Sequence, residues 1–435
     1  MAEEARRPGA GECWAVFLVA LTCYLFIACY LVLNVGRVDW DALAGTAHAY
    51  EAVIAARPPN LALVGFADPP LPVIVQLPLV AAAPRLATEG LAPNVVSGVF
   101  GALTCVLLCR LLAELGAATS LRWALVAAFG LSPAWLRAVA PGASLALFAL
   151  FFVASVLCFV RWARGGALRD LVLAGLAGAG AILTHFESAG VILALCIAFV
   201  AVVRRDRRGS WSEAEGTLIT FLLPVVYVAL LWLATSWAIM HDPLFPIRAM
   251  RRTPEVALLA VSEFLLTTAL VTWFRAATRP WHARCRWAPA TVAALLLGAG
   301  LCVVAGWRTH SLPVAQPYSF LDPASPDERT LADLREVARH VHLRCGDERV
   351  LVDSQLDFAM ALLSGAPYQF IRPVDLERGG RRPGASRTDV SFVLADARAP
   401  NVGIVRAQSL AGIPRLKPVW SRGPWTLYAR RAALR

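Results

Sequence analysis

Apolar runs of helical length, almost free of charged residues, recur along this chain. An α-helix of about 20 such residues crosses the hydrocarbon core of a bilayer with all of its backbone hydrogen bonds satisfied internally. The runs lie near residues 13–35, 92–112, 118–138, 142–160, 168–184, 188–203, 217–240, 255–274 and 287–307. This pattern predicts an α-helical polytopic membrane protein with about nine spans.

The composition excludes an ordinary soluble protein of this length. Across 435 residues, 58% are hydrophobic and only 16% are charged, which is too little charge to cover a water-soluble surface. The formal net charge of +11 is divided among short basic clusters between the apolar runs, as membrane topology requires, so no nucleic-acid partner is expected. Most of the 10 cysteines lie in or beside apolar runs, without a disulfide framework or metal-ligand spacing.

Arginine clusters set the expected orientation. Arg6 and Arg7 precede a first run that is too long for a signal-peptide core, so we expect an inner N-terminus and a retained first span. The later inner loops then contain Arg110, Arg122 and the clusters at 161–169, 204–208 and 275–286. This topology places Cys285 inside and Cys345 outside.

The apolar stretch from Leu71 to Ala83 is not expected to cross. If it crossed, every later helix would be inverted, and the three arginine clusters would have to be translocated against the positive-inside rule. The stretch is also short and is interrupted by Pro72 and Pro78, which suits a broken segment at the membrane interface. We expect a juxtamembrane element on the outer side.

Three outer loops carry polar residues that a site could use. The longest is 36–91, whose start from Asp41 to Ala56 predicts an interfacial helix with Asp39 or Asp41 near its N-cap. A short turn at 184–188 separates two runs. The loop at 241–255 carries three arginines that either hold phosphate or reach lipid headgroups, namely Arg248, Arg251 and Arg252.

From Ser311 onward the sequence predicts a separate module, because prolines mark a linker and charge density then rises. The expected elements are a helix at Asp327–Leu343, a strand at Arg349–Asp353, a helix at Leu356–Leu363, and strands at Val390–Asp396 and Trp425–Arg430. We therefore expect a transmembrane domain at 1–310 and a small extracytoplasmic α/β domain at 311–435. Two strands end in aspartate, which marks either a site or a structural carboxylate.

Several short motifs on the predicted outer face follow one another in a particular order. They are Trp40-Asp41-Ala42 with a helix through Tyr50-Glu51, then Asp68-Pro69-Pro70-Leu71, Ser132-Pro133, Leu183-Thr184-His185 and Asp242-Pro243-Leu244. In order, spacing and placement, over most of residues 10–280, this set resembles the glycosyltransferase-C superfamily. That superfamily includes the lipid-A aminoarabinose transferases and the protein O-mannosyltransferases.

The resemblance implies transfer of a sugar, with inversion, from a polyprenyl-phosphate donor to a hydroxyl of a glycan, lipid or protein acceptor. The reaction would take place on the extracytoplasmic face of the plasma membrane. It needs a carboxylate that accepts the acceptor's proton, and Asp41 matches the family's acidic residue in the first outer loop. The residues expected to bind substrate, including the departing phosphate, are Asp39, Asp68, His185, Glu187, Asp242, Arg248, Arg251 and Arg252.

One departure from the family's pattern leaves the chemistry open. Many relatives place a second acidic residue before the fourth span, where it helps to hold a divalent cation, but residues 137–144 contain no carboxylate. Either arginines neutralise the phosphate without metal, or Glu187 or Asp242 helps to bind a cation such as Mg²⁺ or Mn²⁺, or the protein does not catalyse. The alternatives are a catalytically silent scaffold or binding subunit of an envelope-assembly complex, and a transporter of a lipid-linked substrate. No inverted repeat is visible, which argues against a secondary transporter.

Overall fold

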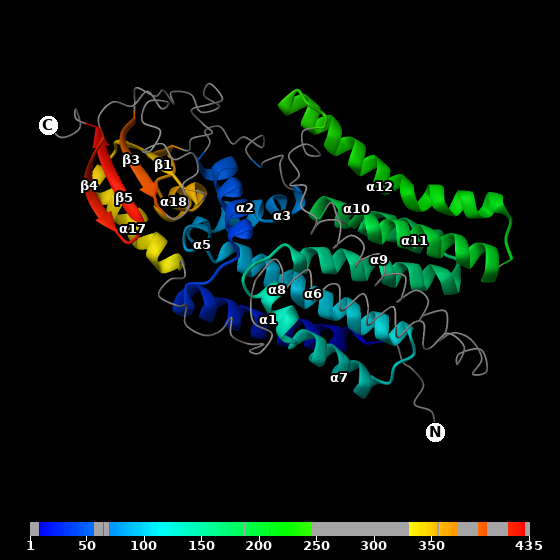
Figure 1. The fold of residues 1–435 in the computed structure, drawn as a ribbon. Helices are drawn as coiled ribbons and strands as arrows, with labels where there is room; N and C mark the ends of the chain where they lie inside the picture. Colours follow the sequence, from blue (N-terminus) through cyan, green and yellow to red (C-terminus); the bar gives the residue numbers. More distant parts are fainter. Residues whose placement is uncertain are drawn as a thin grey trace. The chain divides into compact units, whose positions relative to one another are not determined.

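The computed structural model describes residues 8–55, 64, 69–185, 188–206, 208–244, 330–354, 356–371, 390–397 and 416–430. The chain divides into two compact units (Figure 1). We call residues 1–27, 65–72 and 97–320 the helical unit, and residues 28–64, 73–96 and 321–435 the mixed unit. The domain boundary predicted near residue 310 lies outside the described residues.

Four helices in the described part of the chain are long and apolar enough to cross a membrane. They are α1 (Ala10–Tyr30) with its π-helical extension η1 (Leu31–Val35), α6 (Ala92–Glu114), α9 (Leu145–Gly165) and α12 (Trp211–Met240). Each coincides with one of the predicted runs, at 13–35, 92–112, 142–160 and 217–240. The described part of the chain therefore has the long apolar helices expected of a helical membrane protein.

Two further predicted spans are helical but shorter. Helix α10 (Leu168–Thr184) covers the run at 168–184, and α11 (Ala189–Ala201) continues as the π-helix η5 (Val202–Asp206) over the run at 188–203. The predicted turn between them is confirmed by the end of α10 and the start of α11. The runs at 255–274 and 287–307 lie outside the described residues, so the count of about nine spans stays a prediction.

The prediction of one continuous helix at 118–138 is wrong. The segment forms α7 (Thr119–Gly130) and α8 (Pro133–Val139), separated by a break at Leu131 and Ser132. Ser132 caps α8, since its Oγ accepts a hydrogen bond from the backbone N–H of Trp135 at 3.3 Å, and Pro133 fits the first helical position. Local N-terminal signals thus override an apolar run long enough for a single helix.

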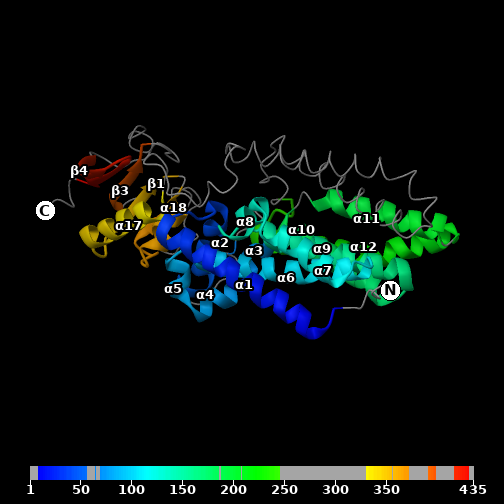
Figure 2. The same ribbon diagram turned by 90° about the horizontal axis from the view of Figure 1, so that it is seen from below.

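Small residues on α10 allow the helical unit to pack closely. Helices α9, α10 and α12 lie side by side (Figure 2). A side chain at Gly175 would collide with the carbonyl oxygen of Phe221 in α12, so glycine is needed for this approach. The rings of Phe159, Phe199 and Phe221 fill the adjacent core, with successive centroids 5.0 Å and 4.8 Å apart.

The first outer loop contributes short helices to the mixed unit. Helix α2 (Trp40–Tyr50) and the π-helix η2 (Glu51–Ala55) confirm the helix predicted at 41–56. The stretch at 71–83 forms α3 (Leu71–Ile74) and α4 (Leu77–Ala82), followed by α5 (Pro84–Thr88). The expected broken segment is confirmed, because neither piece approaches the length of a span.

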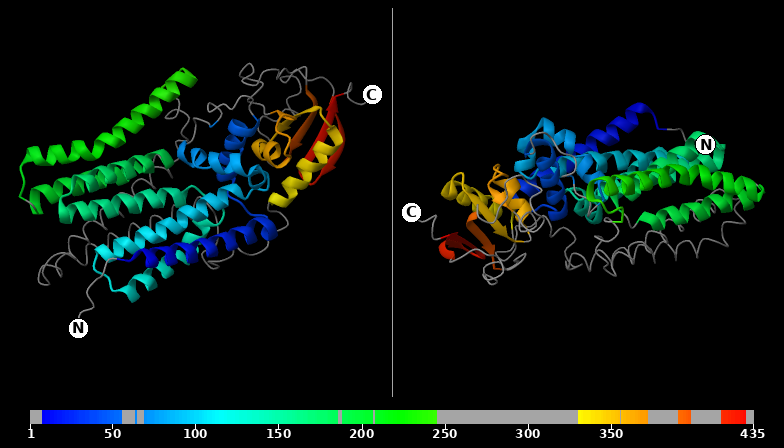
Figure 3. Two further views of the ribbon diagram at one scale, coloured as in Figure 1. Left: turned by 180° about the vertical axis from the view of Figure 1, so that it is seen from behind. Right: turned by 90° about the horizontal axis from the view of Figure 1, so that it is seen from above.

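The C-terminal part of the mixed unit is an α/β module. In chain order it contains α17 (Leu331–Cys345), β1 (Arg349–Asp353), α18 (Asp357–Leu363), β2 (Phe370–Ile371), β3 (Val390–Asp396), β4 (Leu416–Arg422) and β5 (Trp425–Arg430). The sheet order is β2-β1-β3-β5-β4, with β1 parallel to β2 and β3, and β5 antiparallel to β3 and β4. Helix α17 lies against one face of this sheet (Figure 3).

Five elements predicted in this module are confirmed, and two strands were missed. Strand β2 has only two residues, which is too short for a periodic signal. Strand β4 exposes Lys417 and Pro418 side by side, so it lacks the alternation of apolar and polar residues that marks a strand. Its pairing with β5 is therefore a tertiary effect.

Candidate functional site

The mixed unit has one core that joins two segments far apart in the sequence. Leu43 of α2 and Ala87 of α5 are buried in the same cluster as Leu331 of α17. Strands and α18 complete this core, with Val350, Phe370, Leu394 and Met360. The first outer loop, expected as an interfacial element, thus has its described helices packed on the C-terminal module.

Two glycines allow the closest approach between these segments. Gly36 has φ +75°, and its carbonyl accepts a hydrogen bond from the backbone N–H of Leu331 at 2.7 Å. A Cβ atom at Gly36 would lie 3.1 Å from Cβ of Thr330, and one at Gly90 (φ +68°) would lie 2.9 Å from Cδ2 of Leu331. Both positions therefore need glycine for its backbone conformation and for the space it leaves.

Polar contacts tie the same two segments together outside the core. The hydroxyl of Tyr368 donates to the carbonyl of Ala55, and the guanidinium of Arg335 donates to the carbonyl of Glu89. Each of these two contacts links a side chain of the C-terminal module to the backbone of the outer loop, so the outer-loop helices are fixed at several points.

Two side chains near these contacts are shielded from water. Burial raises the pKa of Tyr50 and lowers the pKa of Arg335.

Helix α2 separates the roles of its two leading aspartates. Asp39 is the N-cap, since its Oδ1 accepts the backbone N–H of Ala42 at 2.8 Å. Asp41 lies in the first turn, is exposed, and makes no hydrogen bond or ion pair with another described residue. The predicted N-cap at Asp39 or Asp41 is thus Asp39. The Asp41 carboxylate remains accessible to a reactant.

Buried polar residues lie farther along α2 and in the elements next to it. Thr46 is fully buried, and its Oγ1 lies 2.5 Å from Oε1 of Gln76 at the start of α4. Glu51, in η2, is also buried. The site prediction included none of these three residues. Gln76 had a visible signal, because it is the one polar residue in the otherwise apolar stretch at 71–83.

The aspartates that end β1 and β3 have a structural arrangement. Asp353 and Asp396 are buried at the carboxyl ends of neighbouring parallel strands. Ser354 donates from Oγ to Oδ2 of Asp396 at 3.1 Å and accepts the backbone N–H of Leu356 at 3.1 Å. These bonds tie the start of α18 to β3, which favours the structural alternative for Asp396.

The predicted site residue His185 lies at the end of α10 in the helical unit. Its Nε2 is 3.1 Å from Oγ of Ser144, the residue that precedes α9. The ring of Phe148 packs edge-on against it, with centroids 5.4 Å apart. Ser188 donates from Oγ to the carbonyl of His185 at 2.6 Å. Side chains from α9 and the turn before α11 thus hold this histidine.

Asp242 forms a turn directly after α12. The helix ends with His241 in the left-handed region at φ +58°. Oδ1 of Asp242 accepts the backbone N–H of Leu244 at 3.0 Å, and its carbonyl accepts Oγ–H of Ser236 at 3.2 Å. This turn chemistry is sufficient to account for Asp242 at this position.

The predicted site residues fall into three groups. Asp39 and Asp41 belong to the mixed unit, whereas His185 and Asp242 belong to the helical unit. The remaining residues lie outside the described part of the chain, and they are Asp68, Glu187, Arg248, Arg251 and Arg252. Among the residues that the structure places, no group of three His, Cys, Asp or Glu side chains could hold a metal ion.

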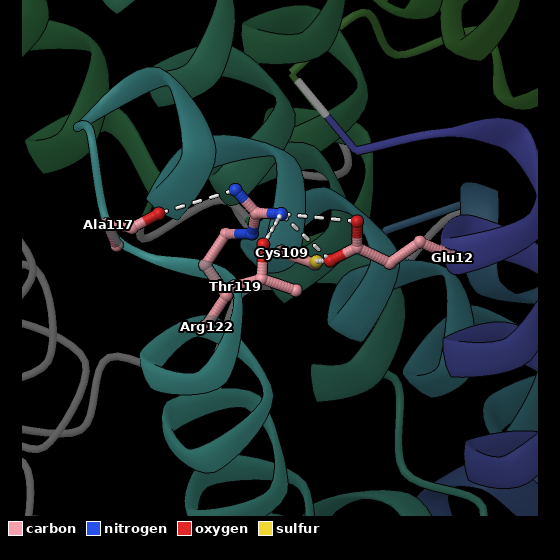
Figure 4. A network of polar contacts seen from close by, with 5 residues as sticks. All are labelled: Glu12, Cys109, Ala117, Thr119 and Arg122. Carbon is pink, nitrogen blue, oxygen red and sulfur yellow. Dashed lines mark hydrogen bonds and ion pairs between the residues drawn. The ribbon is translucent and has the colours of Figure 1, made fainter. Parts of the chain in front are cut away.

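A buried ion pair joins α1 to α7 at the end of the helical unit predicted to lie inside (Figure 4). Arg122 is 1% exposed, and its Nη2 donates to both carboxylate oxygens of Glu12 at 3.1 Å. Thr119, the carbonyl of Ala117 and the thiol of Cys109 complete the network. Arg122 was expected as a loop charge, but its position is that of a structural ion pair.

Glu114 shows the same pattern at the end of α6. Its Oε1 accepts from Nε of Arg161 at 2.9 Å, and Arg164 lies 3.9 Å from its Oε2. Two arginines of the cluster at 161–169, which was predicted to lie inside, thus connect α9 to α6 through a carboxylate.

No protein-family model matches this sequence, and no curated protein is significantly similar to it.

Proposed function

We propose that this protein is a membrane glycosyltransferase that moves a sugar from a polyprenyl phosphate to a hydroxyl of a glycan, lipid or protein. The observation that carries the proposal is the start of α2, directly after the first apolar helix. There Asp39 is engaged in capping, while the neighbouring Asp41 is exposed. A carboxylate that accepts an acceptor's proton has to be accessible in this way.

The shared core of the mixed unit supports the topology that this function needs. A folded core of loops and sheet edges does not extend across the hydrocarbon layer, because unpaired backbone groups are not tolerated there. Residues 36–55, 84–91 and 331–430 contribute to one core, so they belong on the same side of the membrane. It follows that the stretch at 71–83 does not cross and that the chain crosses an even number of times between residues 92 and 330.

The predicted apolar runs satisfy this requirement. One run precedes residue 36 and eight follow between residues 92 and 307, an even number in which the broken run at 118–138 crosses as the successive helices α7 and α8 in this proposal. With the N-terminus inside, the outer loop and the C-terminal module both face the extracytoplasmic side of the plasma membrane. Asp41 then lies where a lipid-linked sugar and a water-soluble acceptor can meet.

Charge neutralisation of the leaving phosphate completes the proposed chemistry. Positive charge stabilises the lipid phosphate as the bond to the sugar breaks. Arg248, Arg251 and Arg252 supply it in this proposal, with Asp39, Asp68, His185, Glu187 and Asp242 in contact with the substrate. A divalent cation such as Mg²⁺ or Mn²⁺ is the alternative source of that charge.

The test compares two neighbouring aspartates that differ in exposure. Asp41→Asn should lower the transfer rate by about 10²–10⁴-fold, because a general base is lost. Asp39→Asn is the matched comparison and should lower the rate less than Asp41→Asn, since asparagine also caps helices and the proposed base is retained. The measurement is transfer of labelled sugar from polyprenyl-phosphate donors by the purified full-length protein, with thermal unfolding recorded for both variants.

Two results would contradict the proposal at different points. Full transfer by Asp41→Asn would mean that Asp41 is not the base. If the unmodified protein transferred no sugar but co-purified with envelope-assembly proteins, the catalytically silent scaffold would be the better explanation.

A further inference from the structure

Ser144 occupies a helix start without capping the helix. It is the N-cap residue of α9, yet its side chain accepts no backbone N–H of that helix. At two other starts the serine does cap, since Ser132 accepts the N–H of Trp135 in α8 and Ser210 accepts the N–H of Glu213 in α12. Serine is favoured at N-caps because of that bond. The hydroxyl of Ser144 is instead directed at Nε2 of His185, 3.1 Å away.

The backbone next to Ser144 is held by a second helix. Oγ of Ser97, in α6, donates to the carbonyl of Ala143 at 3.2 Å. Gly142, just before it, adopts φ +95° and turns the chain into α9. The backbone next to Ser144 is therefore held by α6 as well as by the start of α9.

Phe148 and Ser188 also contact His185, one at the imidazole ring and the other at the backbone carbonyl. Phe148 packs against the ring at an interplanar angle of 72°, and Ser188 holds the carbonyl. A hydroxyl hydrogen-bonded to one ring nitrogen restricts the rotation of the ring, and it can do so with either tautomer because a hydroxyl both donates and accepts. An imidazole with one orientation binds an anionic oxygen better than a rotating one, because less freedom is lost on binding.

We propose that Ser144 is the positioning residue for His185, so that the imidazole binds a phosphate oxygen of the polyprenyl phosphate in one fixed orientation. This inference rests on the proposed function, which supplies the phosphate. The contact between Ser144 and His185, however, is present in the protein without any lipid. The two parts can be tested separately.

The first experiment tests the orientation without any lipid. Diethyl pyrocarbonate acylates an unprotonated imidazole nitrogen, and the modification of His185 is followed by mass spectrometry of the full-length protein. Ser144→Ala should accelerate the reaction several-fold, because Nε2 loses its partner, while Ser144→Thr keeps the hydroxyl and the slow rate. An unchanged rate in Ser144→Ala would overturn the proposal. Thermal unfolding of Ser144→Ala should show at most the loss of this one hydrogen bond, since the serine side chain makes no capping bond to α9.

The second experiment tests the ligand with farnesyl phosphate as the probe. Ser144→Ala should weaken binding by about fivefold, the change expected for one neutral hydrogen bond, and Ser144→Thr should restore it. His185→Ala should weaken binding further, and adding Ser144→Ala to it should have no additional effect if Ser144 acts through the imidazole.

The outcomes separate the positioning role of Ser144 from the proposed transferase function. Equal binding by Ser144→Ala and the unmodified protein would reject the positioning role and leave the transferase proposal standing. Additive losses in the double variant would also reject it, because Ser144 would then act independently of His185. If the unmodified protein bound no farnesyl phosphate, the phosphate part of this proposal and the proposed function would fail together.

Discussion

The helical unit and the mixed unit join distant residues in different ways. In the helical unit, helices close in the sequence lie side by side, and a few charged side chains link their ends, as Glu12 and Arg122 do. In the mixed unit, an outer loop near the N-terminus and a module near the C-terminus share one apolar core. The ion pair described on the mixed unit, between Glu336 and Arg422, is exposed.

This difference shows which features a sequence pattern can reveal. Hydropathy and charge clusters are local, so they indicate helices that pack with their neighbours along the chain. A core assembled from residues 36–91 and 321–435 depends on contacts between segments more than 200 residues apart, as the bond between Leu331 and Gly36 illustrates. No local pattern contains that information.

The largest expected effect is in an experiment that shows which side of the membrane each segment faces, because an introduced cysteine should be labelled either fully or not at all. Asp347 lies in an exposed turn of the mixed unit, and Ala167 lies in the exposed turn between α9 and α10. Each is replaced by cysteine in a separate variant. In a background without native cysteines, a membrane-impermeant maleimide added to intact cells should label the first and spare the second. The reverse pattern would invert the proposed topology.

Native Cys345 is a poor probe for that experiment. It is buried in the core of the mixed unit, and burial raises its pKa to about 12. Since the thiolate is the reactive form, this cysteine should react slowly on either side of the membrane. Cys285, its predicted inner counterpart, lies outside the described residues.

Loss of the buried ion pair should destabilise the helical unit most. Glu12→Gln leaves the guanidinium of Arg122 buried without a counter-charge, and breaking such a pair costs about 3–5 kcal/mol. The partial exposure of Glu12 favours the lower end of this range. Glu336→Gln is the matched control on the mixed unit and should leave stability unchanged, because Arg422 is exposed to water.

Thermal unfolding of the purified protein in detergent gives the measurement for this pair of variants. Equal midpoints for Glu12→Gln and Glu336→Gln would mean that the Arg122 network does not hold the helices together. The buried ion pair of the helical unit would then contribute no more to stability than the exposed ion pair of the mixed unit.

Shortening a core side chain in the mixed unit should lower the free energy of unfolding by as much as Glu12→Gln does, or by less. The loss of stability should extend to both segments that share the core. Leu331→Ala removes a fully buried side chain that contacts the outer loop near Gly90, at a cost of about 2–5 kcal/mol. Leu343→Ala makes the same chemical change on the same helix at a position that is 72% exposed, so it should change stability by about 0.5 kcal/mol or less.

Hydrogen exchange can show whether the shared core is one cooperative unit. In Leu331→Ala, amide exchange should accelerate in α2 as well as in α17, because both helices depend on the same cluster. Faster exchange confined to α17 would show that the outer loop is stable without the C-terminal module.

The candidate site illustrates the limit of reasoning from sequence. The pattern around residue 40 predicted a helix that begins with an acidic cap, but Asp39 and Asp41 were equally good caps until the bond to Ala42 was seen. His185 was predicted as a site residue, yet its partner Ser144 looked like an ordinary helix start. The ion pair of Arg122 was also missed, because Glu12 lies 110 residues away.

The sequence alone predicted the four long apolar helices, the broken segment at 71–83 and five elements of the C-terminal α/β module. These follow from hydropathy, proline positions and local capping, which act within a few turns of the chain. Three features became visible only in the folded protein, namely that α2 packs on the C-terminal module, that Arg122 pairs with Glu12, and that Ser144 binds His185. Each of these depends on which distant groups meet, because buried polar and apolar groups are stabilised by partners that may come from any part of the chain.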